Sequence, residues 1–307
     1  MHAVIDTGET YAAYYDYHEL VERLEAFFGK IREKIFIPKI AIDIMVKKVY
    51  SSWQQYIGFI SGKGNECQTL AKRSLNTAIL TAAITTGLSL FEHQRLQIVE
   101  GALFHDIGML HIPDTILDKP ESLSEAEQQY ITVHPLYGYK ILEEALWPDA
   151  KKLGPIILQH HERWDGTGYP QGLAGLDIDL GARVVSVADA YAAMVSQKVY
   201  RDAMSGYQAM YTLLSNDVSC FDPAILRVFV RSMGICPVGS IVQLNNGAVA
   251  QVVEPDENAF LRPRIRILID QWGNRCTDEN SETIKLSMEK TLSIVKTFTP
   301  GELAEIT

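Results

Sequence analysis

Apolar residues recur at intervals of three or four along most of the chain, which is the spacing of one face of an α-helix. Over residues 17–35 this face includes Leu20, Leu24 and Phe27, and Pro38 suits the first turn of a second helix that continues to about residue 60. Further helices are predicted to begin at Ser124 and to cover residues 68–86, 96–104, 151–162, 182–196, 207–215 and 223–233.

The pattern changes after residue 235. Short runs of β-branched residues at 241–244, 248–253 and 265–269 are separated by turn sequences such as Asn-Gly. We therefore expect a mainly α-helical protein with a small C-terminal antiparallel sheet. A chain of 307 residues has room for about two folded units, and a Ser-Gly-Lys-Gly sequence marks a boundary. The predicted division is an N-terminal helical unit of unknown role at 1–64, a main helical domain at 65–234 and a β-rich extension at 235–307.

Composition narrows the functional classes. The net charge of −10 argues against a general nucleic-acid binder, although bound cations could still attract an anionic substrate into a pocket. The four cysteines form no C-x-x-C pair, which argues against a zinc ribbon or a disulfide framework. The N-terminus lacks the blocks of a signal peptide, and the Thr-rich run at 77–91 is too short to cross a bilayer. A cytoplasmic protein without a membrane span is expected.

Four of the eight histidines, together with two aspartates, lie at or near the ends of successive predicted helices. Imidazoles and carboxylates without thiolates suit iron, manganese, zinc or magnesium. A carboxylate that bridges two cations about 3.5–4 Å apart can hold a nucleophile for attack on phosphorus. A lone His-Asp pair could equally be a core histidine bonded to a capping carboxylate, but six such groups favour a hydrolytic metal centre. The candidate ligands are His105, Asp106, His134, His160, His161 and Asp189.

A glycine-rich segment follows the adjacent histidines. Its glycines, Gly166 and Gly168, could simply permit a tight turn, with Asp165 capping the turn and Tyr169 packing as an anchor beside Pro170. The alternative is a direct role next to the active site.

The order of these motifs resembles that of the HD-GYP domain over about residues 67–233. The matching sequences are HDIG at 105–108, IPDxILxKP at 112–120, HPxxG at 134–138, HHExxDGxGYP at 160–170 and Ala-Asp-Ala at 188–190. The resemblance implies an all-helical, metal-dependent phosphodiesterase of the bacterial messenger cyclic di-GMP, with a di-iron or related centre. It carries over the six candidate residues as metal ligands, with Asp106 bridging. It also implies that the loop at 165–170 flanks the active site and could contact protein partners, such as GGDEF-type proteins.

Three departures make the chain an atypical member. Met109 stands where the family has a lysine that helps to hold the substrate phosphate. The stretch at 69–76 offers neither the His nor the Glu of a third metal site, so we expect two divalent ions, with iron first and manganese next. Lys198 replaces an expected arginine and loses its bidentate fork, whereas Arg201 stays in register. Lys198 and Arg201 are therefore the predicted phosphate contacts.

Two functions from different classes follow. The leading hypothesis is a cyclic di-GMP phosphodiesterase in which a bridging hydroxide, held by Asp106 and Asp189, attacks phosphorus. The alternative is a catalytically weak or inactive module that binds metal and ligand, or a partner protein, for signalling. Three departures favour the alternative: Met109, the missing upstream ligands at 69–76 and the altered segment at 198–199. A phosphohydrolase acting on another nucleotide is disfavoured by the complete HHExxDGxGYP sequence at 160–170.

Overall fold

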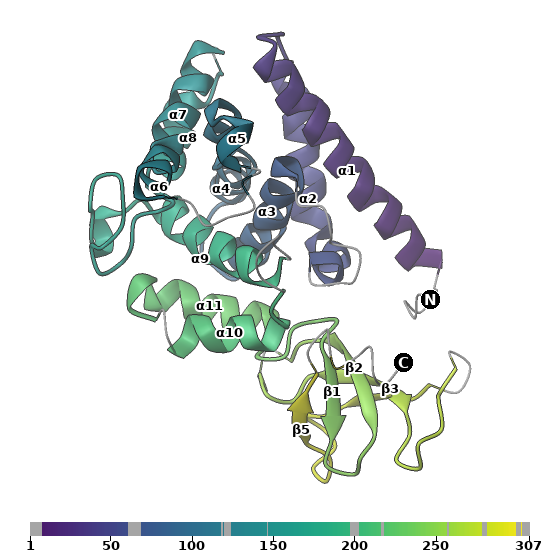
Figure 1. Ribbon diagram of the computed structural model, residues 1–307. Coiled ribbons are helices and arrows are strands. Elements are labelled where there is room, and N and C mark those ends of the chain that lie inside the picture. Colours follow the sequence, from purple (N-terminus) through teal and green to yellow (C-terminus); the bar gives the residue numbers. More distant parts are fainter. Residues whose placement is uncertain are drawn as a thin grey trace.

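The protein consists of a helical part followed by a small sheet (Figure 1). This computed structural model describes the chain except for residues 1–7, 61–68, 118, 120–123, 146, 197–202, 216–217, 257, 278–280, 299–301 and 303–307. Its α-helices are α1 (Gly8–Arg32), α2 (Lys39–Ile60), α3 (Leu70–Thr86), α4 (Glu92–Phe104), α5 (Asp114–Leu117), α6 (Glu125–Ile131), α7 (His134–Glu144), α8 (Ala150–Gln159), α9 (Leu180–Val195), α10 (Gly206–Ser215) and α11 (Pro223–Met233). Short 3-10 turns are η1 (Ile107–His111), η2 (Gly175–Asp177) and η3 (Val218–Cys220).

Local side-chain contacts explain where several helices begin. Ser124 caps α6 by accepting a hydrogen bond from the backbone N–H of Glu127, whose carboxylate accepts one from the N–H of Ser124. Thr69 accepts from the N–H of Lys72 at the start of α3. The helix predicted at 96–104 begins earlier, at Glu92. The prediction missed this first turn because the turn is polar and exposed and carries no apolar period.

Helix α3 lies at the centre of the helical part. It packs against α1, α2, α4, α9 and α11, and every residue from Ser74 to Thr85 is buried. Helices α1 and α2 contribute to the same hydrophobic core; Phe27, for example, stacks on Phe104 with ring centroids 5.5 Å apart. The boundary predicted at residue 64 falls outside the described residues, so the division into 1–64 and 65–234 stays a prediction.

The C-terminal segment forms an antiparallel five-stranded sheet with the order β4-β3-β2-β1-β5. The strands are β1 (Ile241–Leu244), β2 (Val249–Glu254), β3 (Arg264–Ile269), β4 (Thr283–Lys285) and β5 (Ile294–Thr297). Inward residues such as Val242, Val252 and Ile265 give it a separate small core. The predicted fold class, mainly α-helical with a small C-terminal antiparallel sheet, is confirmed. None of the described helices combines the length and apolarity needed to span a bilayer.

Candidate metal centre

The structure brings all six candidate ligands to one place. The residues after α4, the start of α7, the residues after α8 and the middle of α9 each contribute to the group. The side chains of His105, Asp106, His134 and His160 are buried to 97% or more, and the group therefore sits inside the helical part. His105 follows α4, Asp106 precedes η1, His134 begins α7, His160 and His161 follow α8, and Asp189 lies in α9.

Two glycines allow the first two parts of the group to meet. A Cβ atom at Gly108 would lie 1.9 Å from the carbonyl oxygen of His134 and 2.6 Å from the backbone nitrogen of Gly138. Only a residue without a side chain permits η1 to lie this close to the first turn of α7. This close approach places Nε2 of His134 3.2 Å from Oδ1 of Asp106.

The Asp106 carboxylate faces two groups of potential ligands with its two different oxygens. Oδ1 lies 3.2 Å from Nε2 of His134 and 3.7 Å from Nε2 of His160. Oδ2 lies 3.5 Å from Nε2 of His105, which in turn lies 3.4 Å from Oδ1 of Asp189. Two sets of potential ligand atoms therefore share Asp106, and within each set the atoms lie within 4.8 Å of one another. The sets are Asp106, His134, His160 and His161, and His105, Asp106 and Asp189.

The histidine tautomers suit a metal centre. Nδ1 of His105, His134 and His160 each lies 2.7–2.8 Å from a backbone carbonyl three residues earlier, so Nδ1 carries the hydrogen and donates. In the neutral form of each ring, the lone pair of Nε2 then points into the cluster. Nε2 of His134 and Nε2 of His160 are only 3.2 Å apart, and two lone pairs at this distance repel unless a cation or a proton lies between them. Nε2 of His105 is buried and makes no hydrogen bond within the described part of the chain. The donor set fits divalent cations.

The pKa values favour the ligand forms of most of these groups. Burial would raise the pKa values of Asp106 and Asp189, but the positive charge of His105 holds both below their usual range. Burial lowers the pKa values of His160 and His161. Burial would also lower the pKa of His105, yet the two carboxylates outweigh it and raise this pKa to about 9. At pH 7 the carboxylates are ionised and His160 and His161 are neutral, whereas His105 must release a proton before it can bind a cation.

The glycine-rich loop holds an aromatic ring against one of the histidines. The Tyr169 ring stacks on His161 with centroids 4.7 Å apart. Asp165 caps the turn by accepting hydrogen bonds from the backbone N–H and the hydroxyl of Thr167. Gly166 has a φ of +80°, and a Cβ at Gly168 would lie 2.4–2.5 Å from backbone atoms of residues 161–163. Pro170 follows Tyr169 through a cis peptide bond.

Two further residues near the group were not predicted from the sequence. The buried Glu162 carboxylate accepts hydrogen bonds from the backbone N–H groups of Gln171 (2.6 Å) and Leu173 (3.0 Å) and so fixes the loop. Nη2 of Arg73 lies 2.9 Å from Oδ2 of Asp106. The sequence contains one indication of a role for Arg73, because it is a basic residue in the first turn of the central and mostly buried helix α3.

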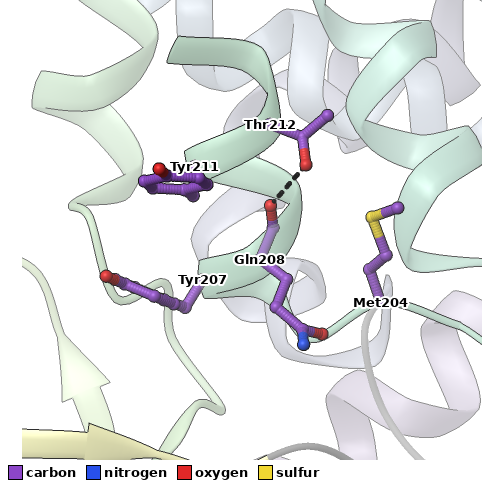
Figure 2. Close-up of a pocket in the computed structure, with 5 residues that line it drawn as sticks. All are labelled: Met204, Tyr207, Gln208, Tyr211 and Thr212. Carbon is purple, nitrogen blue, oxygen red and sulfur yellow. Dashed lines mark hydrogen bonds between the residues drawn. The ribbon is translucent and has the colours of Figure 1, made fainter. Parts of the chain in front are cut away.

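The predicted phosphate contacts, Lys198 and Arg201, lie outside the described residues. A pocket of about 360 Å³ lies elsewhere, along α10 (Figure 2). None of the six candidate ligands lines this pocket, so it is not part of the candidate metal centre. Its lining residues are Met204, Tyr207, Gln208, Tyr211 and Thr212.

Comparisons with known proteins identify the family of this chain. Residues 64–225 match the family described as the HD domain, and residues 241–306 match the KOW domain associated with HD domain. A solved structure of an HDG"Y"P protein from Bdellovibrio bacteriovorus superposes with a TM-score of 0.53 at 18% identity, covering 74% of this chain and 73% of that chain. This likeness concerns the fold.

Curated relatives are phosphodiesterases by name. The cyclic di-GMP phosphodiesterase PdeB of Borreliella burgdorferi is 30% identical over 223 residues, which are 73% of this chain and 58% of that protein. A cyclic di-GMP phosphodiesterase of Pseudomonas aeruginosa is 38% identical over 54% of this chain and 39% of its own length. The 3'3'-cGAMP-specific phosphodiesterase 3 of Vibrio cholerae is 34% identical over 54% of this chain and 36% of its own length. The chain thus spans less than two thirds of each relative.

Proposed function

We propose that this chain, which belongs to the HD domain family and is related to the HD-GYP phosphodiesterases, hydrolyses a phosphodiester bond of a cyclic dinucleotide at the cluster around Asp106. The observation that carries the proposal is the Asp106 carboxylate, whose two oxygens face two separate sets of potential ligands. Cyclic di-GMP is the proposed substrate, because it is the substrate named for two of the relatives. A cGAMP is the nearest competitor.

The proposed centre divides its work between the residues of the chain. Two divalent cations bound here, iron first and manganese next, would polarise the phosphoryl oxygens and activate water. Asp106 would be shared by both cations, whereas Asp189, with 17% of its side chain exposed against 3% for Asp106, lies nearer to solvent. Asp189 is thus suited to accept a hydrogen bond from the attacking water and to orient it. The cations would be held by His105, Asp106 and Asp189 and by Asp106, His134, His160 and His161.

The proposal is tested with metal-free protein reloaded with Fe(II) or Mn(II) and given cyclic di-GMP, with cGAMP in parallel. Chromatography of the products and elemental analysis of the protein are the two readouts. The reloaded protein is expected to bind two ions and to cleave the substrate, and His105→Ala and Asp106→Ala should lose both properties. Full activity in either variant, or a protein that binds no iron or manganese, would overturn the proposal.

The second candidate function is a signalling module with little turnover. Met109, in η1 and three residues after Asp106, is half-buried and uncharged. If a missing cation at this position limits catalysis, Met109→Lys should raise the turnover number. Unchanged turnover in this variant would remove the main argument for a weak enzyme.

A further inference from the structure

Arg73 is the basic residue that touches the shared carboxylate. Its Nη2 lies 2.9 Å from Oδ2 of Asp106, and 37% of the Arg73 side chain is exposed against 3% for Asp106. The Arg73 side chain is therefore bonded to a buried carboxylate and is also partly accessible to solvent. We infer that Arg73 positions the substrate phosphate, because it provides a fixed, partly exposed positive charge in contact with the centre. This inference rests on the function proposed above and concerns the same site.

The position of Arg73 is fixed from both of its ends. Its backbone N–H donates to the carbonyl oxygen of Thr69 (3.0 Å) within the capped first turn of α3. The helix continues from Ser74 as a fully buried segment, so this turn cannot shift without moving the core. The other end of the side chain is held by the hydrogen bond to Asp106. A charge held in place before the substrate arrives needs no reorganisation during the reaction.

Arg73 contacts one of the two ligand sets directly. It contacts Oδ2 of Asp106, the oxygen that faces His105. Nε2 of His105 is also 3.4 Å from Asp189, whose side chain is more exposed than that of Asp106. Around Oδ2 of Asp106, the partly exposed side chains are therefore those of Arg73 (37%) and Asp189 (17%), and this part of the centre is open to solvent.

Guanidinium chemistry suits this task. The group is planar and permanently charged, and its fork matches a phosphate. A carboxylate oxygen has two lone pairs, so Oδ2 can accept from Arg73 and still face the His105 and Asp189 set. Arg73 also supplies a positive charge near the centre that Met109 in η1 does not.

The competing explanation is that Arg73 only neutralises the buried Asp106. The test compares Arg73→Gln and Arg73→Lys with Arg23→Gln, a control that removes an exposed arginine paired with Glu19 on α1. Each variant is loaded with saturating Mn(II), and its metal content and thermal unfolding are measured. KM and kcat for cyclic di-GMP and the calorimetric Kd for inorganic phosphate are then determined.

Positioning predicts that Arg73→Gln keeps its manganese while KM and the phosphate Kd both rise about 10-fold to 100-fold, the range for one charge-assisted hydrogen bond. Arg73→Lys should show a smaller rise, and Arg23→Gln none. Loss of metal or stability with unchanged KM and phosphate Kd would overturn the inference in favour of neutralisation alone. If Arg73→Gln does not fold, Arg73→Lys decides by the same criteria. If the wild-type protein cleaves no cyclic dinucleotide, the proposed function fails, and the phosphate titration alone decides the role of Arg73.

Discussion

Substitution of Gly108 by alanine tests whether the contact between η1 and α7 assembles the metal centre. The new Cβ atom would lie 1.9 Å from the carbonyl oxygen of His134, whereas real Cβ contacts do not fall below 3.0 Å. The difference, 3.0 − 1.9 = 1.1 Å, is the smallest displacement that relieves the clash. The obstacle is backbone and not a flexible side chain, so η1 and α7 must move apart as units.

This displacement is large compared with what a metal centre tolerates. Functional groups must be held to within about 0.5 Å of their productive geometry. A movement of 1.1 Å separates Asp106 from His134, whose ligand atoms are now 3.2 Å apart. We expect Gly108→Ala to lose stability by about 1–3 kcal/mol from overpacking and to lose most of its metal affinity.

Urea unfolding and elemental analysis of the metal-loaded protein measure the two effects. Gly58→Ala in α2 is the matched control, because a Cβ there meets no atom within 4 Å. Alanine in this helix should be neutral or stabilise the protein by up to about 1 kcal/mol and leave the metal content unchanged. The reasoning is refuted if Gly108→Ala binds two ions with the affinity of the wild-type protein.

Two other predictions follow from the buried groups. The metal-free protein should be most stable near pH 6.5. Below this pH the two histidines with lowered pKa values, His160 and His161, bind protons more readily in the unfolded chain, so the folded state loses stability. Above this pH the stabilisation from His105, with its pKa of about 9, is lost as that group deprotonates. A thermal unfolding midpoint that rises steadily from pH 6.5 to 9 would contradict this. Glu162→Gln should lower the free energy of unfolding in urea by about 1–3 kcal/mol, because an amide leaves one of the two bonded loop N–H groups facing an NH₂ donor. An unchanged free energy of unfolding would show that these two hydrogen bonds do not stabilise the loop.

The helices and the position of the candidate centre could be predicted because both depend on local signals. Apolar periodicity predicts most helices of the described chain, and Ser124 and Pro223 stand at the predicted starts of α6 and α11. The candidate ligands stand at element ends or within a recognisable sequence, and the structure brings all six together. Their role as metal ligands stays a prediction. Strands β4 and β5 were missed because they are only three and four residues long and mostly lack buried side chains.

Contacts between residues far apart in the sequence could not be predicted in the same way. Arg73 and Asp106 are separated by 33 positions, and nothing in either local sequence indicates that they meet. The stretch at 69–76 was interpreted only by the ligands that it lacks, although Arg73 lies within it. Glu162 was likewise part of a recognised sequence without an assigned role. Its two hydrogen bonds to the loop depend on how the backbone at 171–173 folds back over the Glu162 side chain.

The contact of Arg73 changes the argument about catalytic strength. Met109 suggested a weak enzyme because one motif position lacks a positive charge, but α3 brings a guanidinium to the Asp106 carboxylate from another part of the chain. The charge of a site is the sum over all elements that reach it, so one missing lysine does not fix that charge. Met109→Lys and Arg73→Gln therefore distinguish a site with a phosphate-binding cation from a site without one. If Arg73 supplies the phosphate contact, Met109→Lys changes turnover little and Arg73→Gln raises KM; if the site lacks a cation, Met109→Lys raises turnover and Arg73→Gln leaves KM unchanged.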